Sequence, residues 1–201
     1  ELEQVLATIL FVDIVRSTEK AARLGDARWT QVINHYYATV RKELKKSHRV
    51  IALDLKGFGW TDRPEGDYSP EAQADLVLGL LGALGVEEPV ALVAHSWGSG
   101  IALQIALRQP ARVTRIALYD AWVYEEQIPM TFLWSRAGGM GELLIGAFYD
   151  ERSDDKIAVA FHDQKYVTEE LIETVEDQLS RPGTKAAALA AIRGQRYEEA
   201  Q

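Results

Sequence analysis

The sequence predicts an α/β fold, with a doubly wound and mainly parallel sheet followed by a C-terminal helical region. Two apolar runs, residues 5–15 and 90–93, have the composition of buried strands, and helical spacing follows each of them. Beyond residue 121, after breaks at Gly138, Gly139 and Gly141, helical segments are expected at about residues 141–149, 153–162, 168–180 and 184–192. Alternation of strand and helix is typical of sheets built from βαβ units.

The amino-acid composition limits the classes of protein to which this chain can belong. The chain has 201 residues and is 47% hydrophobic, enough for one substantial core or at most two small domains. A net charge of −8 and a pI near 5.1 argue against a nucleic-acid partner. Cysteine is absent, which excludes disulfides, thiolate nucleophiles and cysteine–zinc sites. No apolar run approaches the roughly 20 residues of a membrane helix, so we expect a soluble, cytoplasmic protein without a membrane partner or cofactor.

The first element is a β-branched strand at residues 5–15, followed by a helix start at Ser17 or Thr18. After Gly25 and Asp26, helical spacing continues over residues 29–46. A strand followed by an amphipathic helix is therefore predicted.

Residues 10–18, Leu-Phe-Val-Asp-Ile-Val-Arg-Ser-Thr, resemble the opening of a class III adenylate/guanylate cyclase domain. The resemblance implies a metal-binding aspartate at Asp13, whose partner in that family lies on a later hairpin. No such hairpin follows here. Asp13 is therefore interpreted as a vestigial ligand that does not suffice for a metal site, and cyclase activity is not expected.

Residues 57–67 form a turn-rich loop, and Ser69 followed by Pro70 predicts the start of a helix. Its buried face is predicted from the apolar residues Ala72, Leu76, Leu80 and Leu84.

The strand at residues 90–93 ends in a serine turn. From Ser99 onward the apolar residues have helical spacing, so Ser96 lies where strand becomes helix. A strained turn there exposes a hydroxyl, and the N-terminus of the following helix offers free N–H groups to an oxyanion. This arrangement suits a nucleophile.

This stretch resembles the α/β-hydrolase superfamily, whose G-x-S-x-G nucleophile elbow stands here as Ala94-His95-Ser96-Trp97-Gly98. Residues 49–64 resemble the family's fourth strand and its loop, residues 110–120 its sixth strand, and residues 122–201 its helical cap. The resemblance implies Ser96 as nucleophile and the Trp97 backbone N–H as oxyanion donor. It covers residues 47–201.

The chain stops at Gln201, about where the family returns from its cap to the remaining strands, so the strands that carry the late acid and histidine are expected to be missing. Asp120, at the end of the sixth-strand match, is the candidate acid. Among the four histidines, His162 is the candidate base in the cap, and His95 is expected to point away from Ser96. The triad is therefore predicted to be incomplete.

The resemblance also predicts the strand order, because the family's third strand lies between its fourth and fifth. The strand at residues 6–14 occupies that place, which gives the order 2-1-3-4. Asp13 and Ser96 would then share one crevice, where the carboxylate of Asp13 would oppose a developing oxyanion.

We interpret the chain as a chimera of a cyclase-like segment, residues 1–46, and a hydrolase-like segment, made by recombination or design, with natural fusion as the alternative. A composite sheet domain would span residues 1–121 and a helical cap residues 122–201. Little or no turnover is expected. The alternative is a weak esterase that acts on a small ester through Ser96.

A third hypothesis places a nucleotide at the helix N-termini after Asp13 and Ser96, although neither segment has a glycine-rich phosphate loop. An unpaired sheet edge or the cap would permit a homodimer or a domain swap.

Overall fold

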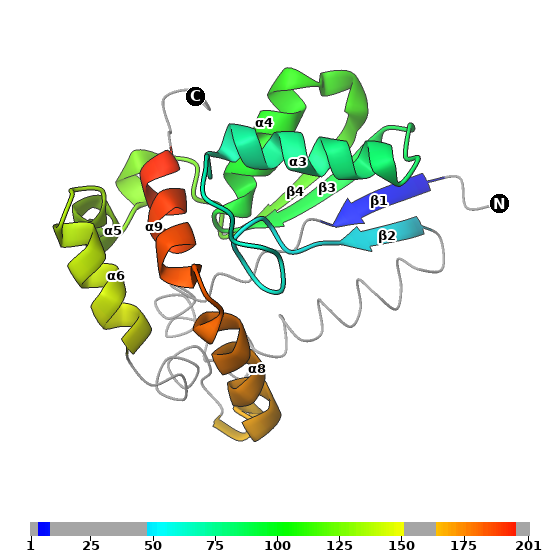
Figure 1. Ribbon diagram of the computed structural model, residues 1–201. Helices are drawn as coiled ribbons and strands as arrows, with labels where there is room; N and C mark the ends of the chain where they lie inside the picture. Colours follow the sequence, from blue (N-terminus) through cyan, green and yellow to red (C-terminus); the bar gives the residue numbers. More distant parts are fainter. Residues whose placement is uncertain (1–3, 9–47, 151–163, 196–201) are drawn as a thin grey trace.

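The computed structural model describes residues 4–8, 48–150 and 164–195 (Figure 1). Four parallel strands form its sheet, in the order β2-β1-β3-β4. They are β1 (Gln4–Thr8), β2 (His48–Ala52), β3 (Val90–His95) and β4 (Val113–Tyr119). The predicted order 2-1-3-4 is confirmed. Residues 9–14 of the predicted first strand and the predicted helix at residues 29–46 lie outside the described residues.

Strand β3 lies inside the sheet, between β1 and β4. Leu92 and Val93, whose side chains point to opposite faces of the strand, are 0% and 9% exposed, as expected for a strand covered on both faces. Helix α4 (Gly98–Arg108) follows it and contributes Ile101 and Ile105 to the same core. The strand and helix on either side of Ser96 are thus both anchored in the core.

Helix α3 (Pro70–Ala83) begins as its sequence predicts. The Ser69 hydroxyl accepts a hydrogen bond from the Ala72 N–H, and Pro70 occupies the first turn, where no intrahelical donor is lost. Gly85 ends the helix with a φ of 65°, a conformation that glycine adopts without steric cost.

The predicted buried face of α3 is wrong. Leu76, Leu80 and Leu84 are 51%, 37% and 41% exposed. The buried residues lie on the adjacent stripe of the helix and are Pro70, Gln73, Ala74, Val77 and Leu81. Both stripes are apolar at helical spacing, and the packing of α3 against α4 and the sheet selects the second one.

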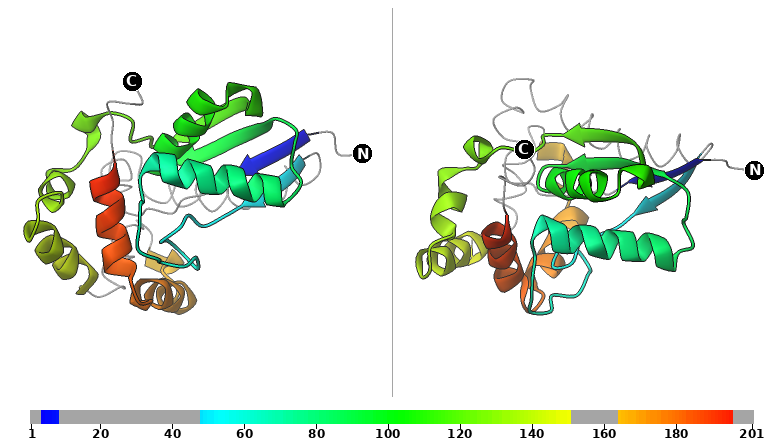
Figure 2. Two further views of the ribbon diagram at one scale, coloured as in Figure 1. Left: turned by 45° about the horizontal axis from the view of Figure 1, so that its top comes forward. Right: turned by 90° about the horizontal axis from the view of Figure 1, so that it is seen from above.

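Helices α3 and α4 lie side by side over one face of the sheet (Figures 1 and 2). All four strands point toward the other group of helices, beyond the carboxyl ends of the strands (Figure 1). Loops at that end therefore lie between the sheet and these helices.

That second group comprises α5 (Met130–Ser135), α6 (Met140–Asp150), α8 (Glu169–Ser180) and α9 (Thr184–Gly194). The last three match the predicted helices at residues 141–149, 168–180 and 184–192. The predicted helix at residues 153–162 lies outside the described residues. Short 3-10 turns occur at Pro110–Arg112, Glu125–Gln127 and Gln164–Tyr166. The domain boundary between residues 121 and 122 stays a prediction.

Helix α9 lies against the loop before α3. Its residue Ala187 is buried, and a Cβ on Gly57 would lie 3.1 Å from the Ala187 Cβ. A Cβ on Gly194 would lie 3.0 Å from the Ser69 backbone nitrogen. Small residues therefore permit a close approach of α9 to the loop before α3.

An ion pair connects α6 to α9. The Glu142 carboxylate contacts the Arg193 guanidinium at 3.0 Å and also accepts a hydrogen bond from the Gly139 N–H. The hydrogen bond from Arg193 is the main cause that lowers the pKa of Glu142. No helix among the described residues is long and apolar enough to cross a membrane.

Candidate active site

Ser96 lies at the turn between β3 and α4, as predicted. Its φ is 51°, in the left-handed region that non-glycine residues rarely adopt. Two backbone hydrogen bonds hold the turn: the Ser96 N–H donates to the Tyr119 carbonyl at 2.9 Å, and the Ser96 carbonyl accepts from the Ser99 N–H at 3.0 Å. The serine is 5% exposed. The geometry is that of a strained nucleophile elbow.

Trp97 begins the turn into α4, as its N-cap residue. Its backbone N–H therefore belongs to the group of helix N-terminal donors that carry a positive partial charge. The indole ring is 8% exposed and packs against Phe58, with ring centroids 5.2 Å apart. Among the described residues, the indole nitrogen has no hydrogen-bond partner.

Asp120 lies directly after β4, next to the serine turn, and also has a left-handed φ, of 46°. Its Oδ2 lies 3.8 Å from Nε2 of His95, which is beyond hydrogen-bond distance but within range of an ion pair when the imidazole is protonated. His95 therefore reaches the end of the neighbouring strand.

The approach of His95 to Asp120 is not predicted by the sequence patterns around either residue. In the parallel pairing of β3 with β4, His95 is opposite Tyr119, the residue before Asp120. Residues that end adjacent parallel strands meet at one edge of the sheet, so this register is the feature that could have indicated the contact.

Two predicted site residues, Asp13 and His162, lie outside the described residues. The structure therefore does not test the vestigial metal ligand or the candidate base. Within the described ranges, no group of three or more His, Cys, Asp or Glu residues is arranged to hold a metal ion.

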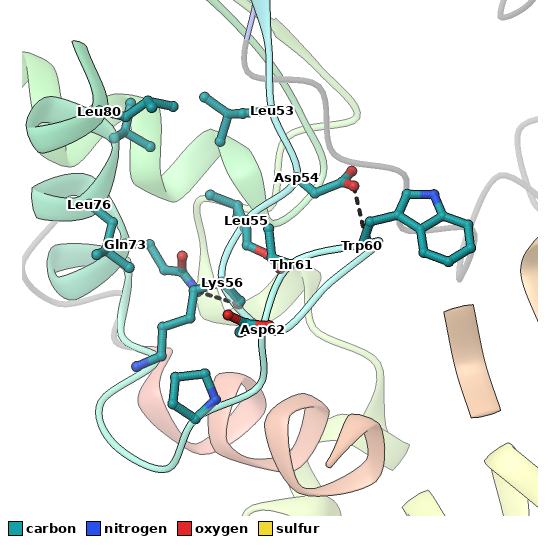
Figure 3. Close-up of a pocket in the computed structure, with 12 residues that line it drawn as sticks. Leu53, Asp54, Leu55, Lys56, Trp60, Thr61, Asp62, Gln73, Leu76 and Leu80 are labelled. Atoms are coloured by element: carbon teal, nitrogen blue, oxygen red, sulfur yellow. Dashed lines mark hydrogen bonds between the residues drawn. The ribbon is translucent and has the colours of Figure 1, made fainter. Parts of the chain in front are cut away.

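A hollow of about 480 Å³ lies between α3 and the loop after β2 (Figure 3). Leu53, Leu76 and Leu80 form its apolar side, and Asp54 and Asp62 are among its polar residues. Gln73 donates from Nε2 to the Lys56 carbonyl at 2.9 Å, while its Oε1 has no partner among the described residues. Ser96 does not line this hollow, so it is separate from the serine turn.

A parallel sheet with a left-handed serine at a strand–helix turn is typical of hydrolases that use a nucleophile elbow. The chain belongs to the alpha/beta hydrolase fold family, whose model matches residues 29–152.

Its curated relatives include hydrolases of small molecules. The 2-hydroxymuconate semialdehyde hydrolase of Pseudomonas sp. (strain CF600) is 46% identical over 80 residues, which are 39% of this chain and 28% of that protein. A protein of the same name from Pseudomonas putida is 34% identical over 139 residues, 69% of this chain and 46% of that protein. The chain thus spans less than half the length of these relatives.

Solved structures with the same fold include Cfl2 from Burkholderia cenocepacia, with a TM-score of 0.69 and 22% identity over 95% of this chain and 64% of that chain. The meta-cleavage product hydrolase of Pseudomonas fluorescens IP01 has a TM-score of 0.56 and 26% identity, over 94% of this chain and 60% of that chain. These matches agree with the family assignment.

The comparisons give no support for a cyclase-derived opening or for a chimera. The family match already begins at residue 29, inside the segment that was predicted to come from a cyclase. The predicted junction at residues 46 and 47 therefore does not coincide with the start of the hydrolase match.

Proposed function

We propose that this protein is a serine hydrolase of small carbonyl compounds, with Ser96 as its nucleophile. The observation that carries the proposal is the left-handed φ of 51° at Ser96, between a buried strand and a helix. Strain of about 1–3 kcal/mol at such a residue persists only where the surrounding structure imposes it. Core residues on both sides of the turn supply that constraint.

The reaction is written for an ester. The Ser96 oxygen attacks the carbonyl carbon while a general base takes the hydroxyl proton, and the Trp97 backbone N–H stabilises the resulting oxyanion. Collapse of this intermediate breaks the bond to the alcohol, which leaves with the proton. Water then attacks the acyl-enzyme, releases the acid and restores the serine.

The relatives favour a small substrate with a reactive carbonyl group. The names of the two Pseudomonas proteins specify a semialdehyde that bears a hydroxyl group, and another relative is named a 2-hydroxy-6-oxo-2,4-heptadienoate hydrolase. We propose small oxo acids of this kind, as well as simple esters, as substrates. In an oxo acid the bond that breaks is the C–C bond next to the attacked carbonyl, and the carbon leaving group takes up the proton that the alcohol takes in an ester.

His162 as the general base and Asp120 as the acid remain predictions. Asp120 has the position to act as an acid because it follows β4, at the same edge of the sheet as Ser96. His162→Gln should abolish Ser96-dependent turnover if His162 is the base, and should leave it unchanged if it is not.

The competing hypothesis is a folded chimera with an inherited elbow and no turnover. Its cyclase-like segment, with Asp13, lies almost wholly outside the described residues. Both hypotheses predict a folded protein, so they differ only in whether Ser96 reacts.

The test is hydrolysis of p-nitrophenyl acetate and of 2-hydroxymuconate semialdehyde by the full chain and by Ser96→Ala. Loss of the nucleophile should lower kcat by at least about a thousandfold. Ser99→Ala is the matched control, because Ser99 is fully buried in α4 and its hydroxyl has no partner among the described residues. Equal rates for the wild type and Ser96→Ala would refute the proposal and favour the inactive chimera.

A further inference from the structure

The loop after β2 is fixed by its own hydrogen bonds. The Asp54 carboxylate accepts from the Trp60 N–H at 3.0 Å (Figure 3), and the Gly57 N–H donates to the Asp62 carbonyl at 3.0 Å. The Thr61 hydroxyl reaches the Phe58 carbonyl at 2.6 Å. The segment from residue 54 to residue 62 can therefore move only as a unit.

Arg63 connects this loop to the turn between α8 and α9. On the loop side its guanidinium donates to the carbonyls of Thr61 at 2.6 Å and Gly59 at 2.9 Å. On the helical side it donates to the Thr184 hydroxyl at 2.7 Å and the Gln178 carbonyl at 3.1 Å. A planar fork of donors makes these contacts together, which the single ammonium of lysine cannot do.

The helical side of this contact is shaped for the arginine. Gly183 has a φ of 87°, and a Cβ there would lie 3.1 Å from the Arg63 Cβ. The Thr184 hydroxyl donates a hydrogen bond to the Arg181 carbonyl at 2.7 Å, which leaves an oxygen lone pair to accept from Arg63. The Arg181 guanidinium lies 5.7 Å from the centre of the Trp60 ring. The two segments thus meet at several points around Arg63.

The same loop also contacts the serine turn. Phe58 packs against Trp97, the residue that follows Ser96 and carries the proposed oxyanion donor. Displacement of the loop would therefore displace the indole and the backbone to which it is attached. The contacts form one path from the α8–α9 turn, through Arg63 and Phe58, to Trp97.

We propose that Arg63 is a positioning residue that clamps the α8–α9 turn to the loop after β2 and thereby holds Trp97 in place beside Ser96. Its effect on catalysis rests on the proposed function. The contact of Arg63 with the α8–α9 turn does not rest on the proposed function, and hydrogen exchange measures it without any turnover.

The structural arm of the experiment is amide hydrogen exchange on the folded full chain, for Arg63→Lys, Thr184→Val and Thr184→Ser. The first two variants should accelerate exchange by about tenfold or more in residues 57–62, 97–100 and 178–184, because both remove the Arg63–Thr184 bond. Thr184→Ser keeps the hydroxyl and should exchange like the wild type. Unchanged exchange in Arg63→Lys and Thr184→Val would overturn the clamp, and acceleration that omits residues 97–100 would overturn its link to the site.

The catalytic arm measures kcat and KM for the same variants. Arg63→Lys and Thr184→Val should each lower kcat by about tenfold, with a smaller change in KM, since a displaced oxyanion donor weakens mainly the transition state. The double variant should lose no more than Arg63→Lys alone, because that substitution already removes the Arg63–Thr184 contact that Thr184→Val removes. Accelerated exchange with unchanged kcat would overturn the positioning role.

The two proposals fail in different ways. If Ser96→Ala is as active as the wild type, the proposed function fails. The hydrogen-exchange pattern alone then still shows whether Arg63 holds the α8–α9 turn against the loop after β2. Circular dichroism of each variant confirms that it is folded. Thr184→Val, which keeps the shape of threonine, provides a second test if Arg63→Lys does not fold.

Discussion

Backbone strain in the described residues concentrates beside the candidate nucleophile. Ser96 and Asp120 are the non-glycine residues with positive φ there, and the Ser96 N–H donates to the carbonyl of Tyr119, the residue before Asp120. This bond connects the turn at Ser96 to the residue that precedes Asp120. Such clustering is typical of functional sites and agrees with the role proposed for Ser96.

A glycine in the loop after β2 is required for steric reasons. Gly59 has a φ of 51°, and a Cβ there would lie 2.2 Å from the Asp54 carboxylate. We predict that Gly59→Ala lowers the free energy of unfolding by at least about 1 kcal/mol. Urea denaturation followed by circular dichroism measures the change.

Gly79 provides the matched control. It lies within α3 and a Cβ there meets nothing within 4 Å. Gly79→Ala should raise the free energy of unfolding by up to about 1 kcal/mol, because alanine has the higher helix propensity. Equal effects of the two substitutions would contradict the steric explanation for Gly59.

At the scale of elements, α3 has two apolar stripes, and only one of them is buried. Its stripe of Leu76, Leu80 and Leu84 borders solvent, while Val77 and Leu81 belong to the core. Burial on this helix therefore does not follow residue size: the smaller Val77 packs in the core, while Leu76 and Leu80 do not.

Neighbouring leucines on α3 should respond differently to truncation. Leu81 is 0% exposed and Leu80 is 37% exposed. Leu81→Ala should cost about 2–5 kcal/mol of unfolding free energy, because it leaves a cavity. Leu80→Ala should cost about 1 kcal/mol or less. Thermal and urea unfolding of both variants measure the two changes. A larger loss of unfolding free energy for Leu80→Ala than for Leu81→Ala would contradict the observed orientation of the helix.

At the scale of the whole molecule, the described sheet ends in β2 on one side and β4 on the other. Ile116 and Tyr119 of β4 are 37% and 45% exposed. An outer strand with exposed apolar residues favours pairing with another chain. The self-association expected from the sequence stays a prediction.

We therefore predict that the sedimentation coefficient rises with protein concentration in analytical ultracentrifugation. Ile116→Lys should suppress the rise, because a charge on an outer strand disfavours edge pairing. Leu143→Lys changes an equally apolar residue on α6, which is 67% exposed, and should not suppress it. A sedimentation coefficient independent of concentration would show that the sheet edges do not pair under these conditions.

Local patterns in the sequence determined much of this protein. The buried run before Ser96, the Ser69–Pro70 helix start and the spacing of the later helices each predict an element that the structure contains. The strand order followed from the resemblance to hydrolases, which the family match supports. These features depend on residues close together in the chain or on a family motif.

Tertiary structure alone decided the contacts between distant segments. It selected the buried stripe of α3, brought His95 to 3.8 Å from Asp120, and joined Arg63 to Thr184 across the chain. Periodicity shows that a helix has apolar residues but not which of two adjacent stripes meets the sheet. A hydrogen bond between residues 121 positions apart depends on how separate elements pack, and no local pattern encodes that distance.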